Sequence, residues 1–134
     1  MNHLRAVAAC LLFTAAALAA DIPRIAPAEA AKLVAEGKAV LVDIREPREW
    51  AQSGVAEPAV LLPKSDFDGD QRQWKAFLAA NRDQQLILYC GSGGRASVVG
   101  SILAEKGIKV ANAGGLRDWS KAGLPLRKVN EKEK

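Results

Sequence analysis

The sequence predicts an α/β fold, namely an open parallel β-sheet with helices on both of its faces. Short, mainly apolar runs alternate along the chain with mixed polar and apolar segments of helical length. Runs that are apolar throughout, rather than at every second position, are typical of strands buried on both faces by helices. With 134 residues the chain has room for one domain and not for two independent cores.

The expected elements follow one another in regular order. Strands are predicted over four segments, residues 39–43, 59–62, 86–89 and 108–113. Helices or helical turns are predicted over residues 28–36, 48–52, 71–81, 95–106 and 116–122, most of them ended by a glycine or proline. Loops are predicted over an acidic segment (65–70), a glycine-rich turn (90–94) and a tight turn (114–115).

The first twenty residues predict a secretory signal peptide. An apolar run over residues 6–18 follows Arg5 and ends in small residues, which favours cleavage after Ala19 or Ala20. The run is shorter than the about 20 apolar residues of a spanning helix, so an uncleaved anchor is the weaker alternative. Cys10 ends a sequence similar to a lipoprotein cleavage box, but the apolar run continues past it, which favours ordinary cleavage.

We therefore divide the chain into a signal peptide (residues 1–20), a domain (21–126) and a charged tail (127–134) that we expect to fray. Cleavage would remove His3 and Cys10, so that the mature domain has no histidine and Cys90 as its one cysteine. That composition excludes a Cys-His or Ser-His relay, a zinc site with histidine and an internal disulfide. No pattern indicates a metal or an organic cofactor, and we expect none.

The net charge of +4 comes from interspersed charges of both signs, without the basic stripe and interleaved aromatics of a nucleic-acid-binding protein. A modest attraction for small anions is compatible with this charge. We expect no nucleic-acid partner, no membrane association after signal cleavage, and a monomer.

The loop between the third predicted strand and the next helix is the candidate site. It begins at Cys90, and the candidate binding residues follow it: Gly91, Ser92, Gly93, Gly94 and Arg95. Three glycines let the backbone curl and point successive N–H groups inward as an anion-binding nest, and the helix start adds its unpaired amides. Such a setting lowers the pKa of a thiol from about 8.5 to roughly 7 or below, which supplies a nucleophile without a general base. Ser92 and Ser97 are expected to cap the helix, with donation to a bound anion as the weaker alternative.

Other interpretations of this loop are weaker. A nucleotide-phosphate loop would end in Gly-Lys-Ser/Thr, which is absent. A phosphatase or arsenate reductase would need Cys-x5-Arg, whereas only four residues separate Cys90 from Arg95 and Ala96 takes the required position. A thiol-disulfide oxidoreductase would need Cys-x-x-Cys. A buried, unreactive cysteine at a tight turn is the structural alternative.

Three segments, in order, carry a family resemblance. Residues 41–50 resemble the signature D-x-R-x-x-x-E-aromatic, residues 86–97 resemble a catalytic cysteine loop, and residues 113–119 resemble a G-G-x-x-x-W segment. Together they resemble rhodanese domains over about residues 25–126. With its predicted signal peptide, the chain further resembles the single-domain periplasmic rhodaneses of bacterial phage-shock operons, which implies a periplasmic location.

The resemblance implies a sulfurtransferase that moves sulfane sulfur from thiosulfate or a similar donor, through a persulfide on Cys90, to cyanide or a thiol acceptor. The partners it implies are small sulfur-containing anions and thiophilic acceptors. Arg95 would hold the anionic donor or the persulfide charge, and Asp43 and Arg45 would fix the neighbouring loop as structural support. Trp50 and Trp119 are expected in the core or at its rim.

Two departures from the family pattern leave questions open. Gly91 stands where the family often has arginine, and the Cys-Gly-Ser-Gly opening resembles mercaptopyruvate sulfurtransferases, so thiosulfate and mercaptopyruvate both remain candidate donors. The histidine that usually follows the first signature is absent. A non-enzymatic persulfide carrier or sensor, or a partner-binding rhodanese module, is the alternative function.

Overall fold

The main sheet has four parallel strands, as the sequence predicts. The computed structural model describes residues 20–133, and the predicted export signal lies almost wholly outside them. The strands are β1 (Ala39–Asp43), β3 (Val60–Leu61), β4 (Gln85–Cys90) and β5 (Val110–Gly115), in the order β3-β1-β4-β5. Every pairing between neighbours is parallel, so the carboxyl ends of all four strands meet at one edge of the sheet.

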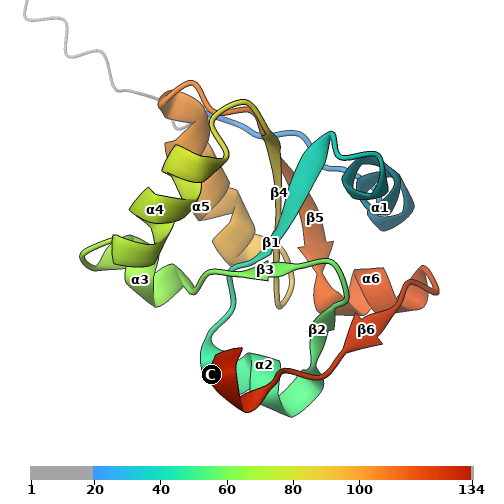
Figure 1. The fold of residues 1–134 in the computed structure, drawn as a ribbon. Helices are drawn as coiled ribbons and strands as arrows, with labels where there is room; N and C mark the ends of the chain where they lie inside the picture. The colour runs from blue at the N-terminus through green and yellow to red at the C-terminus, as the bar shows by residue number, and fades with distance from the viewer. Residues whose placement is uncertain (1–19, 134) are drawn as a thin grey trace, which may run out of the picture.

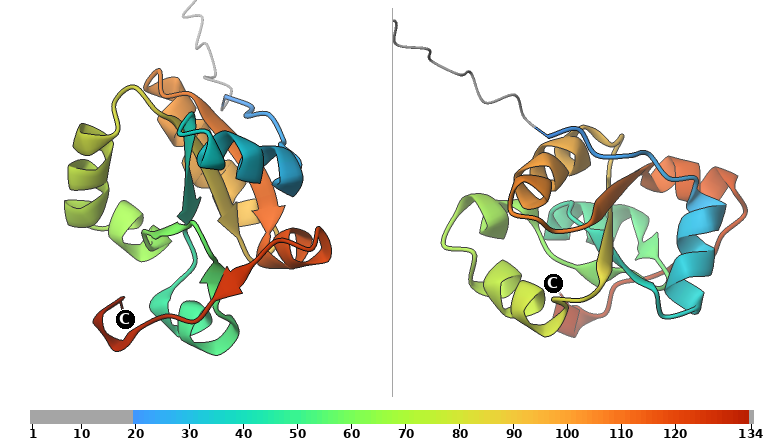
Figure 2. Two further views of the ribbon diagram at one scale, coloured as in Figure 1. Left: turned by 45° about the vertical axis from the view of Figure 1, so that its right-hand side comes forward. Right: turned by 90° about the horizontal axis from the view of Figure 1, so that it is seen from above.

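Helices cover both faces of this sheet, which confirms the predicted fold class (Figures 1 and 2). One face carries α1 (Pro27–Ala35) and α6 (Leu116–Lys121). The other carries α3 (Lys64–Asp68), α4 (Arg72–Ala80) and α5 (Gly94–Glu105). The remaining helix, α2 (Pro47–Ser53), lies beyond the carboxyl edge of the sheet.

Burial on both faces explains why residues 86–90 of β4 are apolar throughout. Leu86, Leu88 and Cys90 belong to the buried cluster beneath α3, α4 and α5. Ile87 and Tyr89 belong to the cluster beneath α1 and α6. Successive side chains of a strand point to opposite faces, so a strand covered on both sides buries them all.

A two-stranded antiparallel sheet, which the sequence analysis missed, lies below the main one. It pairs β2 (Val55–Ala56) with β6 (Leu126–Arg127). The hydroxyl oxygen of Tyr89 accepts a hydrogen bond from the Ala56 amide at 2.9 Å and ties this small sheet to the end of β4. Strands of two residues carry too little periodicity to be seen in a sequence.

Three local predictions were wrong. The acidic segment 65–70 was expected as a loop, but it contains most of α3. The helical turn buries Phe67, whose ring packs edge-on against Trp74 with the ring centroids 5.1 Å apart, and this packing stabilises the helix. The predicted turn at 114–115 is instead the end of β5. The tail expected to fray starts with Arg127 in β6, and its guanidinium pairs with Glu133 at 3.0 Å at the end of a short 3-10 helix (Glu131–Glu133).

Within residues 20–133, every helix is too short or too polar to cross a membrane. The predicted signal peptide remains a prediction, because residues 1–19 fall outside the part of the chain that the structure describes.

Replacement of Tyr89 by phenylalanine tests the link between the two sheets. The ring is 1% exposed and stays in place, but the buried Ala56 amide loses its acceptor. We expect Tyr89→Phe to lower the free energy of unfolding by about 1–3 kcal/mol, measured by urea denaturation. An unchanged free energy of unfolding would show that this hydrogen bond does not stabilise the domain.

Candidate active site

Cys90 is the last residue of β4 and lies at the carboxyl edge of the sheet, next to Gly115 of β5. The side chain is buried, with 1% of the residue exposed. Its sulfur accepts a hydrogen bond from the backbone amide of Gly93 at 3.1 Å. The chain therefore folds back over the thiol within three residues, as a strand-to-helix loop rich in glycine allows.

Two opposing effects set the pKa of Cys90. Burial is the largest influence and by itself would raise the pKa of the thiol. Hydrogen bonds from the backbone amides of Ala96, Ser92, Gly93 and Arg95 favour the thiolate, and together they hold the pKa of Cys90 below its ordinary value. The sulfur thus lies in a nest of amides that stabilises a negative charge without a neighbouring histidine.

The loop turns into α5 at Gly93, whose φ of 100° lies in the left-handed region that side chains disfavour. A Cβ at this position would also come within 2.6 Å of the Arg24 guanidinium. Gly93 is the N-cap of α5, and no side chain caps this helix, so the expected capping by Ser92 or Ser97 was wrong. Gly91, Ser92 and Gly94 form the exposed outer side of the loop.

Asn112 anchors the loop from the neighbouring strand, and the sequence analysis gave it no role. It is 1% exposed, its Nδ2 donates to the Gly93 carbonyl at 2.9 Å, and its Oδ1 accepts from the Gly114 amide at 2.8 Å. A single amide side chain thus fixes both the cysteine loop and the end of β5. A polar residue inside a buried strand is the signal that would have found it, because buried polar groups need partners.

Close packing of two backbones explains the glycine pair at the end of β5. Gly114 has a φ of 86°, and a Cβ on Gly115 would overlap the carbonyl of Gly91. Only a residue without a side chain lets β5 lie directly against the cysteine loop. The third sequence signature therefore serves the same site as the second.

Arg95 does not point freely into the loop. Its Nη1 and Nη2 donate to Oε2 and Oε1 of Glu49, at 2.7 and 2.8 Å, in a bidentate ion pair. These hydrogen bonds lower the pKa of Glu49 to about 2, against the opposing effect of partial burial. Glu49 also accepts from the Glu46 amide at 2.9 Å as part of the capping box of α2.

The Glu49 pair links three loops at this edge of the sheet. Glu46, the N-cap of α2, accepts hydrogen bonds from the amide and hydroxyl of Ser65 at 3.0 and 2.6 Å. The loops that follow β1, β3 and β4 are thereby joined through Glu46, Glu49 and Arg95. Glu49 lies within the first signature, but the sequence analysis assigned it no contact.

Asp43 and Arg45 form the expected salt bridge, with Arg45 Nη2 2.7 Å from Asp43 Oδ2. Asp43 is fully buried and Arg45 is 3% exposed. Arg45 also donates to the Ser53 hydroxyl at 2.7 Å and the Gly54 carbonyl at 2.8 Å, which are at the end of α2. Each nitrogen of its guanidinium donates to at least one of these partners, so its position serves to hold α2 at the edge of the sheet.

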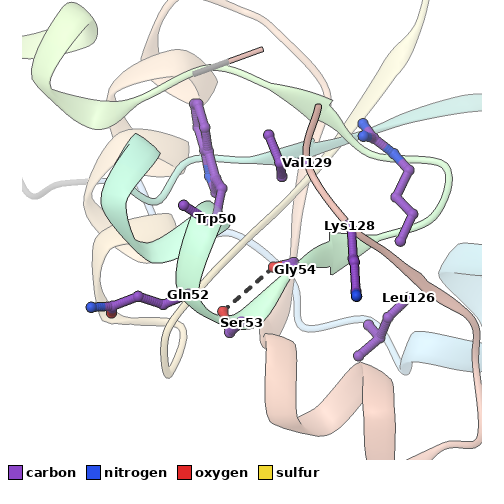
Figure 3. Close-up of a pocket in the computed structure, with 9 residues that line it drawn as sticks. Trp50, Gln52, Ser53, Gly54, Leu126, Lys128 and Val129 are labelled. Atoms are coloured by element: carbon purple, nitrogen blue, oxygen red, sulfur yellow. Dashed lines mark hydrogen bonds between the residues drawn. The ribbon is translucent and has the colours of Figure 1, made fainter. Parts of the chain in front are cut away.

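The two tryptophans of the first and third signatures are core residues, with Trp50 3% and Trp119 2% exposed. The indole nitrogen of Trp119 donates to the Pro125 carbonyl at 3.0 Å. Trp50 lines a cavity of about 490 Å³ between α2 and the C-terminal segment, where Leu126, Lys128 and Val129 form the opposite wall (Figure 3). No residue of the cysteine loop lines this cavity.

Among residues 20–133, no three His, Cys, Asp or Glu side chains are grouped so that they could hold one metal ion. The groups that surround the sulfur of Cys90 are backbone amides, with the guanidinium groups of Arg95 and Arg24 beside the loop, and both kinds of group suit an anion.

The comparison with protein families matches the model of the rhodanese-like domain to residues 26–122, which is most of the chain. The chain belongs to the rhodanese family. An uncharacterized protein of Synechocystis is 31% identical over 107 residues, which cover 78% of this chain and 56% of that protein. The chain thus spans little more than half the length of this relative.

Solved structures share the rhodanese fold. A Rhodopseudomonas palustris protein described as a possible tyrosine phosphatase is 28% identical, with a TM-score of 0.66, over 79% of this chain and 85% of that one. The human single-domain sulfurtransferase is 28% identical, with a TM-score of 0.59, over 74% and 96%. The polysulfide-sulfur transferase of Wolinella succinogenes, at 23% identity and a TM-score of 0.67 over 87% and 85%, shows likeness of fold alone.

The ionisation of Cys90 can be measured by its alkylation. We expect the rate with iodoacetamide to rise with pH to a midpoint below about 8.5, the pKa of an unperturbed cysteine, because amides at the sulfur favour the thiolate. At any pH below this midpoint the fraction of thiolate, and with it the rate relative to its plateau, should therefore exceed that of a free cysteine.

The pH midpoint of Cys90 alkylation in the wild type is compared with that in Asn112→Ala. Loss of its two hydrogen bonds releases Gly93, whose amide donates to the sulfur, so the midpoint should move up toward that of free cysteine. A wild-type midpoint at or above 8.5 would contradict the amide nest. An unchanged midpoint in Asn112→Ala would show that Asn112 does not position the loop.

Proposed function

We propose that this rhodanese domain is a sulfurtransferase that carries sulfane sulfur as a persulfide on Cys90. The observation that carries the proposal is a buried sulfur at the start of α5 that accepts a hydrogen bond from the Gly93 amide at 3.1 Å, where the backbone amides of the loop lower its pKa against the effect of burial. A thiolate held in this way is a nucleophile, and the persulfide it forms is an anion that the same amides can bind.

The transfer has two steps. The Cys90 thiolate attacks the outer sulfur of a donor such as thiosulfate; a new S–S bond forms, the S–S bond of the donor breaks, and its electron pair leaves with sulfite. The acceptor, cyanide or a thiolate, then attacks the outer sulfur of the Cys90 persulfide and releases the Cys90 thiolate. Cyanide becomes thiocyanate, and no electrons are gained or lost overall.

Other residues of the site hold the loop. Asp43 and Arg45 anchor α2, while Gly91, Ser92, Gly93 and Gly94 supply the curled backbone. The human single-domain sulfurtransferase, 28% identical, supports sulfur transfer as the class of reaction. The predicted leader adds a location in the periplasm, as in the phage-shock rhodaneses that the sequence resembles, and we propose a monomer.

Phosphate-ester hydrolysis is less well supported, although one structural relative is described as a possible tyrosine phosphatase. A phosphate group needs a wider loop whose arginine faces the anion. In this chain Arg95 comes after four intervening residues and is paired with Glu49.

The first test is thiocyanate formation from thiosulfate and cyanide, with mass spectrometry of the peptide that contains Cys90. We expect the wild type to gain one sulfur atom on Cys90 and to form thiocyanate. Cys90→Ser should lose both completely, since a hydroxyl at this position is not ionised. An unmodified Cys90 with every sulfane donor tried would instead favour a partner-binding module, and a stable persulfide without turnover would favour a carrier or sensor.

Arg95→Ala tests the charge at the mouth of the loop. The substitution leaves Glu49 without its partner, so an anionic donor meets an uncompensated carboxylate. We expect KM for thiosulfate to rise about threefold to tenfold while iodoacetamide, which is uncharged, still alkylates Cys90. An unchanged KM for thiosulfate would show that Arg95 does not contribute to donor binding.

A further inference from the structure

The ion pair of Glu49 and Arg95 lies at the mouth of the catalytic loop. About a third of each side chain is exposed, 35% for Glu49 and 34% for Arg95. The guanidinium also lies against the residue that follows the catalytic cysteine, because a Cβ on Gly91 would be 3.0 Å from Arg95 Nη2. The absence of a side chain at Gly91 therefore leaves the space that Arg95 occupies while it is paired.

The pairing sets the charge that a donor meets. The Nη1–Nη2 edge of Arg95 is engaged by the two carboxylate oxygens, so this edge is not available to an oxyanion of the same shape, although Nε–H and one N–H of each Nη atom remain. Arg45 and Lys64, two of the cations that follow β1 and β3, are likewise paired, with Asp43 and Asp68. On the Gly91 side of the loop a donor thus meets backbone amides and a guanidinium whose charge Glu49 largely cancels, whereas the Arg24 guanidinium lies on the opposite side, against Gly93 and Gly114.

We propose that Glu49 is a specificity-determining residue, which withholds the charge of Arg95 and so favours a sulfane-sulfur donor with at most one negative charge, such as an organic hydropersulfide, over a dianion such as thiosulfate. The inference rests on the proposed function and names its substrate class. A dianion depends most on an unpaired cation, whereas a hydropersulfide needs only the amides at the reacting sulfur.

The transfer from a hydropersulfide balances without a co-reactant. The Cys90 thiolate attacks the outer sulfur of R–S–SH, a new S–S bond forms, and the S–S bond of the donor breaks. The electron pair of that bond leaves with R–S as a thiolate, and Cys90 becomes Cys–S–SH. Loss of its proton gives the persulfide anion, which lies among the same amides.

The test compares two donors, thiosulfate and cysteine hydropersulfide, by the rate at which peptide mass spectrometry detects sulfur on Cys90. We expect Glu49→Gln to raise the rate constant of sulfur transfer from thiosulfate about fivefold, because Arg95 loses its carboxylate partner. The rate constant of transfer from the hydropersulfide should change less than twofold. Asp68→Asn is the matched control: it removes one negative charge from another ion pair at the same edge and should change both rates less than twofold.

A second comparison, between Arg95→Gln and the double variant Arg95→Gln/Glu49→Gln, keeps the test decisive if Glu49→Gln also perturbs α2. Arg95→Gln should lower the thiosulfate rate, and adding Glu49→Gln to it should restore most of the loss, because the uncompensated carboxylate is then gone. An unchanged ratio of the two donor rates in Glu49→Gln, or no recovery in the double variant, would overturn the proposal.

Alkylation separates this inference from the proposed function. Iodoacetate carries one negative charge and iodoacetamide none, so the ratio of their rates at Cys90 reports the local charge without sulfur transfer. We expect the ratio to rise about threefold in Glu49→Gln and to stay unchanged in Asp68→Asn. If this ratio rises in Glu49→Gln but Cys90 never gains sulfur, only the proposed sulfurtransferase function is contradicted. If the ratio stays constant in Glu49→Gln, the proposed role of Glu49 is contradicted.

Discussion

The site depends on the hydrogen bonds that backbone amides make to one buried sulfur. Burial of Cys90 at the end of β4 disfavours a charged thiolate, and an isolated thiol at this depth would stay protonated. The amides of the loop reverse this outcome because the strand ends, the chain curls and a helix begins within four residues. Secondary structure, rather than an acid-base partner, therefore favours the thiolate form of this cysteine.

Much of the remaining architecture keeps that loop curled. Asn112 holds the carbonyl of Gly93 from the neighbouring strand, and Gly115 lets the end of β5 approach the carbonyl of Gly91. On the other side, Glu49 holds Arg95, the first side chain after the glycines. The loop is therefore held by β5 on one side and by α2 on the other. Its amides are oriented before any anion binds, so the backbone does not have to become ordered when an anion arrives.

The sequence predicted the parts of this structure that depend on local pattern. The four strands, the two covered faces and the position of Cys90 at a strand end follow from apolar runs, helical periodicity and glycine placement. The contacts that complete the site do not, because they join residues far apart in the chain: Arg95 with Glu49, Asn112 with Gly93, Tyr89 with Ala56. Helix α3 was missed since the burial of Phe67 against Trp74 overrode an acidic, loop-like sequence.

The pairing of Arg95 also gives the first signature a part in the chemistry. Asp43 and Arg45 hold the end of α2, the Glu46–Glu49 capping box holds its start, and Glu49 thereby presents a fixed carboxylate to the loop that carries Cys90. A carboxylate beside a thiolate would raise the pKa of the thiol and repel anions. The guanidinium between loop and carboxylate offsets that repulsion, so the ion pair lets an acidic helix lie beside the thiolate-stabilising amides of the loop.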